Sequence, residues 1–326
     1  WPAGAEMLWT TALCSTARPP QRAVLSTMST AKTFLERSAG EWAGWQCEFS
    51  AAGELKPVDE RYLSQETIDY GMQPAGFELL ATETVDGGGA LHRRFLRFLP
   101  ADGCACDNLS AEVSMSHIPA AALEARCCGD AELGVFTMDD PPGDGGDDWY
   151  LRTYFETAAP PPSAEGRGGA QEARWRTRLS LRWESAGRLA RGKRVRMAVE
   201  RLWATDAGTL NGELNQGGAS LVAGKTAATG CDASFVAGVT GARCFASLTA
   251  GGEDTSSGRD DGKLLLPGGA AVRMISHPSR GTAIEVVLSD AAGNEKVARR
   301  EFGADGALDA TTFAAAGPAC GGTERA

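Results

Sequence analysis

The sequence predicts an all-β protein in which a short amino-terminal helix leads into an antiparallel β-barrel and a second, smaller β-rich half follows. Three observations predict this class. Apolar runs of strand length recur along the chain, and turn-forming Gly, Pro and Asp residues separate them. Glycine is frequent, at 41 of 326 residues, which favours short strands over long helices. The run RWRTRLSLRWE at 174–184 alternates throughout between two kinds of side chain, as a β-strand does.

The amino-terminal segment, residues 1–30, has the composition of an organellar transit peptide. The stretch MLWTTALCSTARPPQRAVLSTMSTAKTF contains no acidic residue, carries basic residues and is rich in Ser and Thr. Transit peptides share this composition, and a plain disordered tail has a similar one. We therefore expect a transit-peptide-like or disordered segment there, followed by a barrel over 31–205, a second half over 206–316 and a disordered tail over 317–326.

A short helix is expected at residues 29–38. A hydroxyl side chain at position 29 or 30 can cap its first turn, and Ser38-Ala39-Gly40 ends it, because Gly is favoured just past a helix. Trp42 and Trp45 follow at once. We expect Trp42 to fill the base of the barrel and Trp45 to begin its first strand.

About eight strands are expected between residues 45 and 204, which suits an up-and-down barrel with one interior. The runs are 45–50, 76–85, 90–99, 109–118, 122–128 with 132–138, 149–157, 174–184 and 193–204. A Gly- and Ala-rich stretch at 208–230 separates them from the second region, whose expected strands lie in 242–249, 262–277, 282–290 and 294–314. The second region forms a smaller barrel or a partly open sheet, or it completes the first barrel.

The strand at 174–184 has one apolar face and one charged face. Its apolar face carries Trp175, Thr177, Leu179, Leu181 and Trp183. Its other face carries Arg174, Arg176, Arg178, Arg182 and Glu184. An antiparallel sheet with one solvated face shows this pattern, so we expect these arginines to face water.

Composition excludes several classes of function. The formal net charge is −10, which disfavours nucleic acid and anionic lipid as partners. No apolar run approaches the roughly 18 residues that a transmembrane helix needs. A zinc site is not expected, because the nine cysteines are irregularly spaced and there are only three histidines, at 92, 117 and 277. We expect mostly reduced, buried or half-buried thiols.

Familiar catalytic and metal motifs are absent from the sequence. The acidic run DDPPGDGGDD at 139–148 lacks the register of a calcium loop, so we interpret it as a solvated loop. His117 and His277 each lie at a strand end without a partner pattern typical of a triad, and we interpret them as surface or core residues. There is no nucleophile elbow and no dinucleotide-binding fingerprint.

Tryptophan and arginine side chains are the remaining candidates for a ligand site. Aromatic-lined concave sites bind flat ligands well, and Arg offers a two-pronged fork to a carboxylate such as a propionate. Arg201 falls on the apolar side of its strand and therefore needs a partner if it is buried, with Glu200 and Glu83 as potential counterions in the barrel. The candidate ligand-binding residues are Trp45, Arg94, Trp149, Trp175, Trp183, Arg201 and Trp203. The alternative is that the tryptophans fill the core and that the arginines pair with Asp and Glu.

Two stretches resemble known families. FLERSAGEWAGWQCEFS, residues 34–50, resembles the opening of calycin-like lyases that attach bilins to phycobiliproteins, where a helix runs through a Ser-Ala-Gly-x-Trp turn into the first barrel strand. The carboxy-terminal pieces LLLPGGAAVRMI, GTAIEVVLSD and EKVARREFGADGALDATTF are similar to a family of unknown function from cyanobacteria and plastids with two lipocalin-like halves. The resemblance implies a calycin-like barrel, a lipocalin-like second half and a plastid setting.

Three functions follow from the resemblance and the residues. The first is a non-catalytic plastid protein that carries or assembles a small hydrophobic or tetrapyrrole ligand, such as chlorophyll, a bilin or a carotenoid. The second is a structural peripheral subunit or scaffold of a photosynthetic membrane complex. The third is a bilin-lyase-like enzyme. The expected location is the chloroplast, soluble or peripheral to the thylakoid, with the mitochondrion as the alternative.

Overall fold

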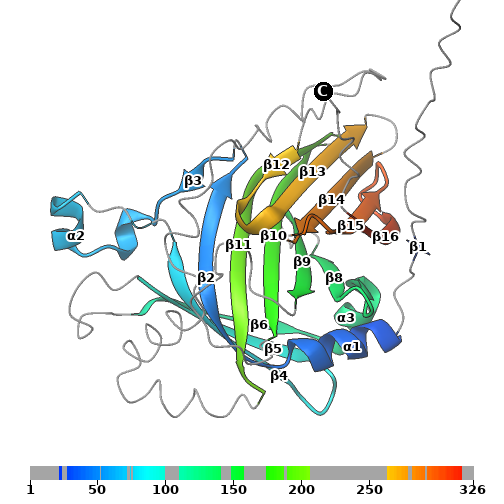
Figure 1. The fold of residues 1–326 in the computed structure, drawn as a ribbon, viewed down its shortest axis with the longest axis horizontal. Coiled ribbons are helices and arrows are strands. Elements are labelled where there is room, and N and C mark those ends of the chain that lie inside the picture. The colour runs from blue at the N-terminus through cyan, green and yellow to red at the C-terminus, as the bar shows by residue number, and fades with distance from the viewer. Residues whose placement is uncertain are drawn as a thin grey trace, which may run out of the picture.

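The computed structural model describes residues 22–23, 28–51, 53–71, 74, 76–99, 110–140, 148–157, 174–186, 189–205, 263–277, 281–290 and 292–317. The predictions for 158–173, 208–230, 242–249, the tail from 318 and most of 1–30 concern positions outside these residues. The described residues form two antiparallel sheets, which confirms the all-β class (Figure 1).

The larger sheet has ten strands in the order β6-β5-β4-β2-β11-β10-β9-β8-β7, with β3 beside β2. Its strands are β2 (Gly40–Ser50), β3 (Leu55–Lys56), β4 (Phe77–Val85), β5 (Leu91–Phe98), β6 (Ser110–Ile118), β7 (Cys127–Asp130), β8 (Val135–Asp140), β9 (Asp148–Thr157), β10 (Trp175–Ala186) and β11 (Leu189–Ala204). Most of the expected strands are thus confirmed to within a few residues. The first one begins earlier than expected, at Gly40 rather than at Trp45.

The smaller sheet has six strands in the order β1-β16-β15-β14-β13-β12. Its strands are β1 (Arg22–Ala23), β12 (Lys263–Leu265), β13 (Ala270–His277), β14 (Gly281–Ser289), β15 (Glu295–Phe302) and β16 (Leu308–Ala316). A 3₁₀ turn, η5 (Pro267–Gly269), separates β12 from β13. It interrupts the run 262–277 where the residues Pro-Gly-Gly predict a turn, and its Gly268 adopts a φ of 64°.

The first helix, α1 (Met28–Ser38), confirms the predicted helix and presents one buried face. Ala31, Phe34, Leu35 and Ser38 recur at helical spacing and are all buried. The helix ends where Gly40 adopts a φ of 127°, a conformation that favours glycine. Two short helical segments, η1 (Glu60–Tyr62) and α2 (Gln65–Asp69), follow β3 in the chain.

A second short helix, α3 (Ala120–Arg126), corrects the expected strand at 122–128. Its sequence AAALEAR consists of strong helix formers, and only Leu123 within it is buried. The strand β7 begins directly after it, at Cys127. The helix connects β6 and β7, the two outermost strands of the large sheet, and lies beside α1 (Figure 1).

The large sheet curls into a half-barrel. Four strands separate β5 from β9 in the sheet, yet the guanidinium of Arg93 on β5 lies 5.4 Å from the ring centroid of Tyr154 on β9. A flat sheet would hold these strands more than 20 Å apart, at about 4.8 Å per strand. We call the face that carries Arg93 and Tyr154 the concave face. Figure 1 shows the same curl, since β4, β5 and β6 run across the ends of β2, β11 and β10.

The other face of the large sheet, the convex face, packs against the smaller sheet. One apolar cluster contains Trp45, Leu179 and Met197 from the large sheet together with Ile284 and Phe313 from the small one. An ion pair of 2.6 Å between Arg300 on β15 and Asp139 on β8 adds a polar link. The two sheets therefore share one core, although no strand joins them edge to edge among the described residues.

Asp139 and Asp140 belong to β8 rather than to the predicted acidic loop. Asp139 is largely buried against Arg300, and Asp140 forms an ion pair with Arg152. This corrects the interpretation of 139–148 for its first two residues and its last one, because the pairing of β8 with β9 reaches Asp140 and β9 begins at Asp148. Residues 141–147 lie outside the described part of the chain.

In the described ranges, every helix is too short or too polar to traverse a bilayer.

Candidate functional site

Four of the predicted ligand-binding tryptophans lie together at the contact between the two sheets. Trp45, Trp175 and Trp183 are buried in the shared core, and the half-buried Trp149 packs against it. The rings of Trp149 and Trp183 stack with centroids 5.9 Å apart, and Phe302 of β15 lies 5.6 Å from Trp183. In this structure the four indoles pack against protein side chains, and their role in ligand binding stays a prediction.

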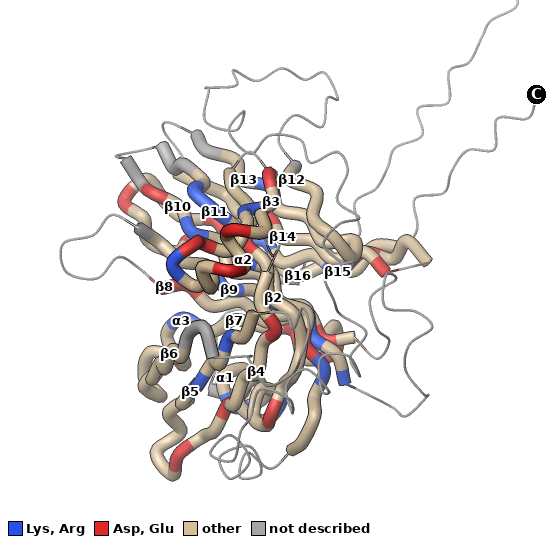
Figure 2. Tube along the Cα trace, turned by 90° about the vertical axis from the view of Figure 1, so that its left-hand side faces the viewer, with Lys and Arg blue, Asp and Glu red and all other residues tan. Residues whose placement is uncertain are grey.

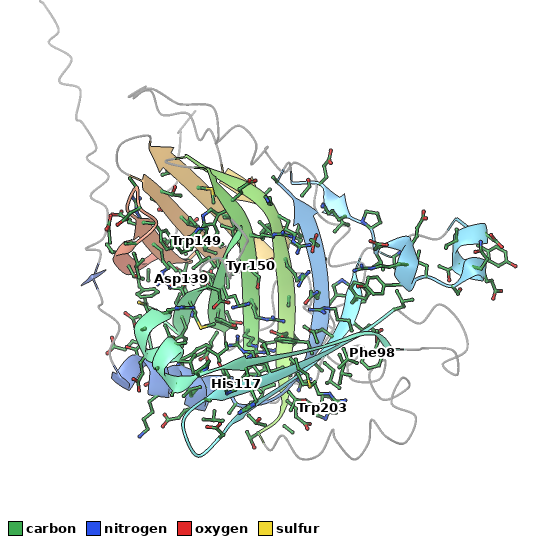
Figure 3. The ribbon with its side chains drawn as sticks, turned by 180° about the vertical axis from the view of Figure 1, so that it is seen from behind. Phe98, His117, Asp139, Trp149, Tyr150 and Trp203 are labelled. Atoms are coloured by element: carbon green, nitrogen blue, oxygen red, sulfur yellow. The ribbon has the colours of Figure 1, made fainter. Side chains whose placement is uncertain are left out.

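The remaining predicted residues lie outside that core. Arg201 is half-buried on the convex face, and its guanidinium lies 6.0 Å from the Trp175 ring, so its position on the apolar side is confirmed. Trp203 is 43% exposed near the end of β11. Arg94 is half-buried on β5 and borders a surface groove. Figure 3 places Trp203 and His117 toward one end of the molecule and Trp149 toward the other.

The concave face contains a buried ion network rather than water-facing arginines. Arg176 donates to Glu200 at 2.8 Å and to Glu83 at 2.9 Å, and Arg178 donates to Glu200 at 3.2 Å. Arg93 lies 3.6 Å from Glu83. All five side chains are at most 7% exposed. The prediction that Arg176 and Arg178 face water is therefore wrong, because the curl of the sheet encloses that face.

The charges of this network stabilise one another. Burial alone would raise the pKa of Glu200, but Arg176 and Arg178 outweigh burial and lower this pKa to about 2. Burial also opposes the charge of Arg176, whereas Glu200 and Glu83 raise its pKa. Glu200 and Glu83 thus serve as counterions inside the half-barrel, and their ion-pair partners include Arg176, Arg178 and Arg93 on the concave face, whereas Arg201 lies on the other face. Figure 2 shows the same mixing, with basic and acidic positions interspersed over the fold.

Aromatic rings line the network. The guanidinium of Arg176 lies 4.0 Å from the centroid of Trp42, and that of Arg178 lies 4.5 Å from Phe95. Trp42 is fully buried, and its indole N–H donates to the carbonyl oxygen of Ser38 at 2.8 Å. This bond joins the end of α1 to the first strand. The concave interior is therefore occupied by the side chains of the protein itself.

A groove of about 330 Å³ lies on the convex face of β4, β5 and β6. Its residues come from adjacent positions in the sheet register, which aligns Thr82 with Arg94 and Met115, and Thr84 with His92 and His117. Met115 is 80% exposed, and Val113, two residues earlier on the same strand, is 49% exposed. The groove thus combines exposed apolar side chains with one guanidinium and two imidazoles. The described residues that border it are Thr82, Thr84, His92, Arg93, Arg94, Met115, Ser116 and His117, and of these Arg93 directs its guanidinium to the concave face.

Three side chains at one end of the groove have ligand atoms within 4.8 Å of one another. They are Asp86, His92 and His117. The sequence interpretation missed this group because it treated each histidine separately. An antiparallel pairing of the strands 90–99 and 109–118 already places the start of one beside the end of the other, which is the signal that could have found it.

A second pocket, of about 460 Å³, lies where α1 and α3 meet the turn between β4 and β5. Ala31, Leu35 and Leu123 provide its apolar wall. Lys32 and Glu124 also border the pocket. The turn at Gly88 and Gly89 borders this pocket.

Comparisons with known proteins find likenesses among solved structures alone. No protein-family model matches the sequence, and no curated protein matches it. The chain is similar to the crystal structure of a protein of unknown function from the DUF3598 family of Nostoc punctiforme. The TM-score is 0.45 with 11% identical residues, and the alignment covers 89% of this chain and 99% of that chain. A likeness of this size carries no argument about function.

Proposed function

We propose that the protein is a non-catalytic binding protein for a small hydrophobic ligand with an acidic group, held in the groove on β4, β5 and β6. The observation that carries this proposal is the groove itself, with Met115 exposed beside Arg94. Exposed apolar side chains in a surface groove mark interaction sites. An arginine at the same place supplies a fork for a carboxylate.

Tetrapyrroles are the ligand class that fits this chemistry best. A bilin or a chlorophyll derivative with a free propionate offers a flat apolar body together with a carboxylate. The apolar body would lie against Met115, and the carboxylate would pair with Arg94. A carrier or assembly factor in the plastid is the corresponding role, which the family-like motifs support.

The test is a titration of the purified full chain with a bilin, a chlorophyll derivative and a carotenoid. Saturable binding is followed by tryptophan quenching and by the shift of the pigment absorption band. Met115→Asp should weaken binding at least tenfold, because it places a charge on the apolar wall. Tyr70→Asp is the matched control, since Tyr70 is 73% exposed next to α2 and does not line the groove.

A second variant separates the two parts of the proposal. Arg94→Gln should weaken binding of the bilin, because the carboxylate of the bilin loses its guanidinium partner. Binding of an uncharged carotenoid should not change, because a carotenoid has no carboxylate. The absence of saturable binding to all three pigments would contradict the proposal. Equal affinities for Met115→Asp and Tyr70→Asp would place the binding elsewhere on the molecule.

A peripheral-subunit role is the second candidate, and one observation favours it. The strand β6 is an outer strand of the large sheet and exposes Val113 and Met115. Unpaired edges with apolar side chains are surfaces to which a partner strand can add. Native fractionation of a photosynthetic membrane extract tests this role: co-migration with a large complex supports it, and migration only as a free monomer contradicts it.

A further inference from the structure

The two histidines of the groove face each other across paired strands. His92 on β5 and His117 on β6 are register partners, and their ring centroids lie 4.6 Å apart with planes inclined by 41°. They are two of only three histidines in the whole sequence. Both are exposed, so either ring can turn toward a shared third group.

Asp86 supplies that third group from the turn between β4 and β5. Its Oδ1 accepts hydrogen bonds from the N–H groups of Gly88 and Ala90, each at 2.9 Å. Its backbone carbonyl accepts from Gly89 at 3.0 Å, and Gly89 adopts a φ of 79° that favours glycine. The turn therefore holds one carboxylate oxygen in place and leaves Oδ2 directed at His92, 3.1 Å from its Nε2.

These contacts give the carboxylate the supporting shell that metal-binding carboxylates have. Ligating carboxylates are themselves hydrogen-bonded, which fixes their orientation. The same pair of backbone hydrogen bonds holds Asp290 in the turn after β14, so these bonds orient the Asp86 carboxylate, and the two neighbouring imidazoles are what distinguishes this turn.

We infer that Asp86, His92 and His117 form a binding site for a divalent transition-metal ion of the Zn²⁺ class. Two imidazoles and one carboxylate are a donor set that zinc, nickel, copper and ferrous iron accept. Around such an ion, bonds of about 2.1 Å place ligand atoms about 3.4 Å apart. The present spacing, within 4.8 Å, closes to that value by rotation of exposed side chains, without movement of the strands.

Three protein ligands leave a further coordination position. Both histidines line the groove, so this position opens into it. Structural zinc sites are closed by four protein ligands, whereas sites with three keep a position for water or another ligand. The site thus offers the groove a Lewis-acidic centre for an oxygen ligand. This inference is independent of the pigment proposed above.

The test is a calorimetric titration of the full chain with Zn²⁺ after alkylation of its accessible thiols, so that cysteine does not compete. One ion should bind per chain. His92→Gln, His117→Gln and Asp86→Asn should each weaken binding at least tenfold, because each removes a ligand. His277→Gln is the matched control, since position 277 ends β13 in the other sheet, and it should bind as the wild type does.

Proton NMR gives a second readout that thiol-bound metal does not imitate. With only three histidines, the three variants assign every imidazole signal. Zn²⁺ should shift the signals of His92 and His117 and leave that of His277 unchanged. Circular dichroism confirms that each variant is folded. No binding, equal affinity in wild type and His117→Gln, or a shift of the His277 signal alone would overturn the inference.

Discussion

Arg176 on β10 and Glu83 on β4 form a 2.9 Å ion pair across the concave face, although two other strands lie between theirs. Their side chains are 2% and 0% exposed. In a flat sheet the two strands would lie about 14 Å apart, so this short contact indicates that the sheet is curled into the half-barrel. Because Arg93 and Arg178 join it through Glu83 and Glu200, the pair anchors a network rather than an isolated bridge.

Removing one acidic member of this network should destabilise the protein strongly. Glu83→Gln leaves Arg93 and Arg176 buried with less compensating charge. We expect a loss of about 3–5 kcal/mol in the free energy of unfolding, the range for breaking a buried ion pair. Urea denaturation followed by circular dichroism measures it.

The matched control is Glu184→Gln, whose partner Lys193 lies 3.2 Å away, with both side chains 38% exposed. Exposed pairs contribute about 0–1 kcal/mol, so this variant should stay close to the wild type. Equal losses in the two variants would show that burial of the network has no special role.

The pKa of Glu200 predicts how stability depends on acid. Its folded-state pKa is about 2, below the ordinary value of 4.5. The unfolded chain therefore binds more protons between these values. The stabilisation of the folded state by the Glu200 carboxylate is fully present above about pH 4.5. It is lost as pH falls toward 2, and the free energy of unfolding then decreases by about 3 kcal/mol at most. Unfolding curves at pH 2–6 measure it, and Glu200→Gln should have a flatter profile, whereas identical slopes would contradict this assignment.

The close approach of β2 and β11 depends on Gly44. A Cβ atom at this position would lie 1.9 Å from the carbonyl oxygen of Val199, which is backbone and cannot turn aside. Gly44→Ala should therefore cost about 3 kcal/mol or more, at or above the upper end of overpacking effects. Gly87→Ala is the control, since its Cβ would meet nothing within 4 Å. A Gly44→Ala protein as stable as Gly87→Ala would refute the tight contact between these strands.

The buried Trp183 and the exposed Trp203 should differ in how much they contribute to the free energy of unfolding. Trp183 is 3% exposed and touches Trp149 and Phe302, so Trp183→Ala should cost about 3–5 kcal/mol. Trp203 is 43% exposed, so Trp203→Ala should change stability by less than about 1 kcal/mol. Thermal and urea unfolding of both variants measures these losses. A larger loss for Trp203→Ala than for Trp183→Ala would contradict the packing of the shared core.

The helix and most strands could be predicted from local patterns. Ala31, Phe34 and Leu35 show helical spacing, and Trp175 to Trp183 show the alternation of a strand. These signals arise within one element, where the periodicity of side chains is set by the backbone. The strand expected at 122–128 is wrong over 122–126, because the buried Leu123 stands alone there and helix propensity is the better guide.

The curl of the large sheet and the groove could not be predicted. Alternation assigns Arg176 and Trp175 to opposite faces, but it does not say which face is enclosed. Only the long-range approach of β5 to β9 encloses the arginines. Likewise, an antiparallel pairing of the runs 90–99 and 109–118 brings His92 near His117, but only the register of the two strands makes them direct partners, and the sequence does not specify that register. Of the cysteines in the described part of the chain, Cys47, Cys127 and Cys128 are buried, as expected.

The shared core has a consequence for synthesis of the chain on the ribosome. The apolar convex face of β9, β10 and β11 is complete before β12 to β16 have been translated, because those strands come later in the sequence. Until they arrive, Trp175 and Trp183 have no cover from the smaller sheet. The nascent chain therefore passes through a stage with an exposed apolar surface, at which a chaperone would protect it most.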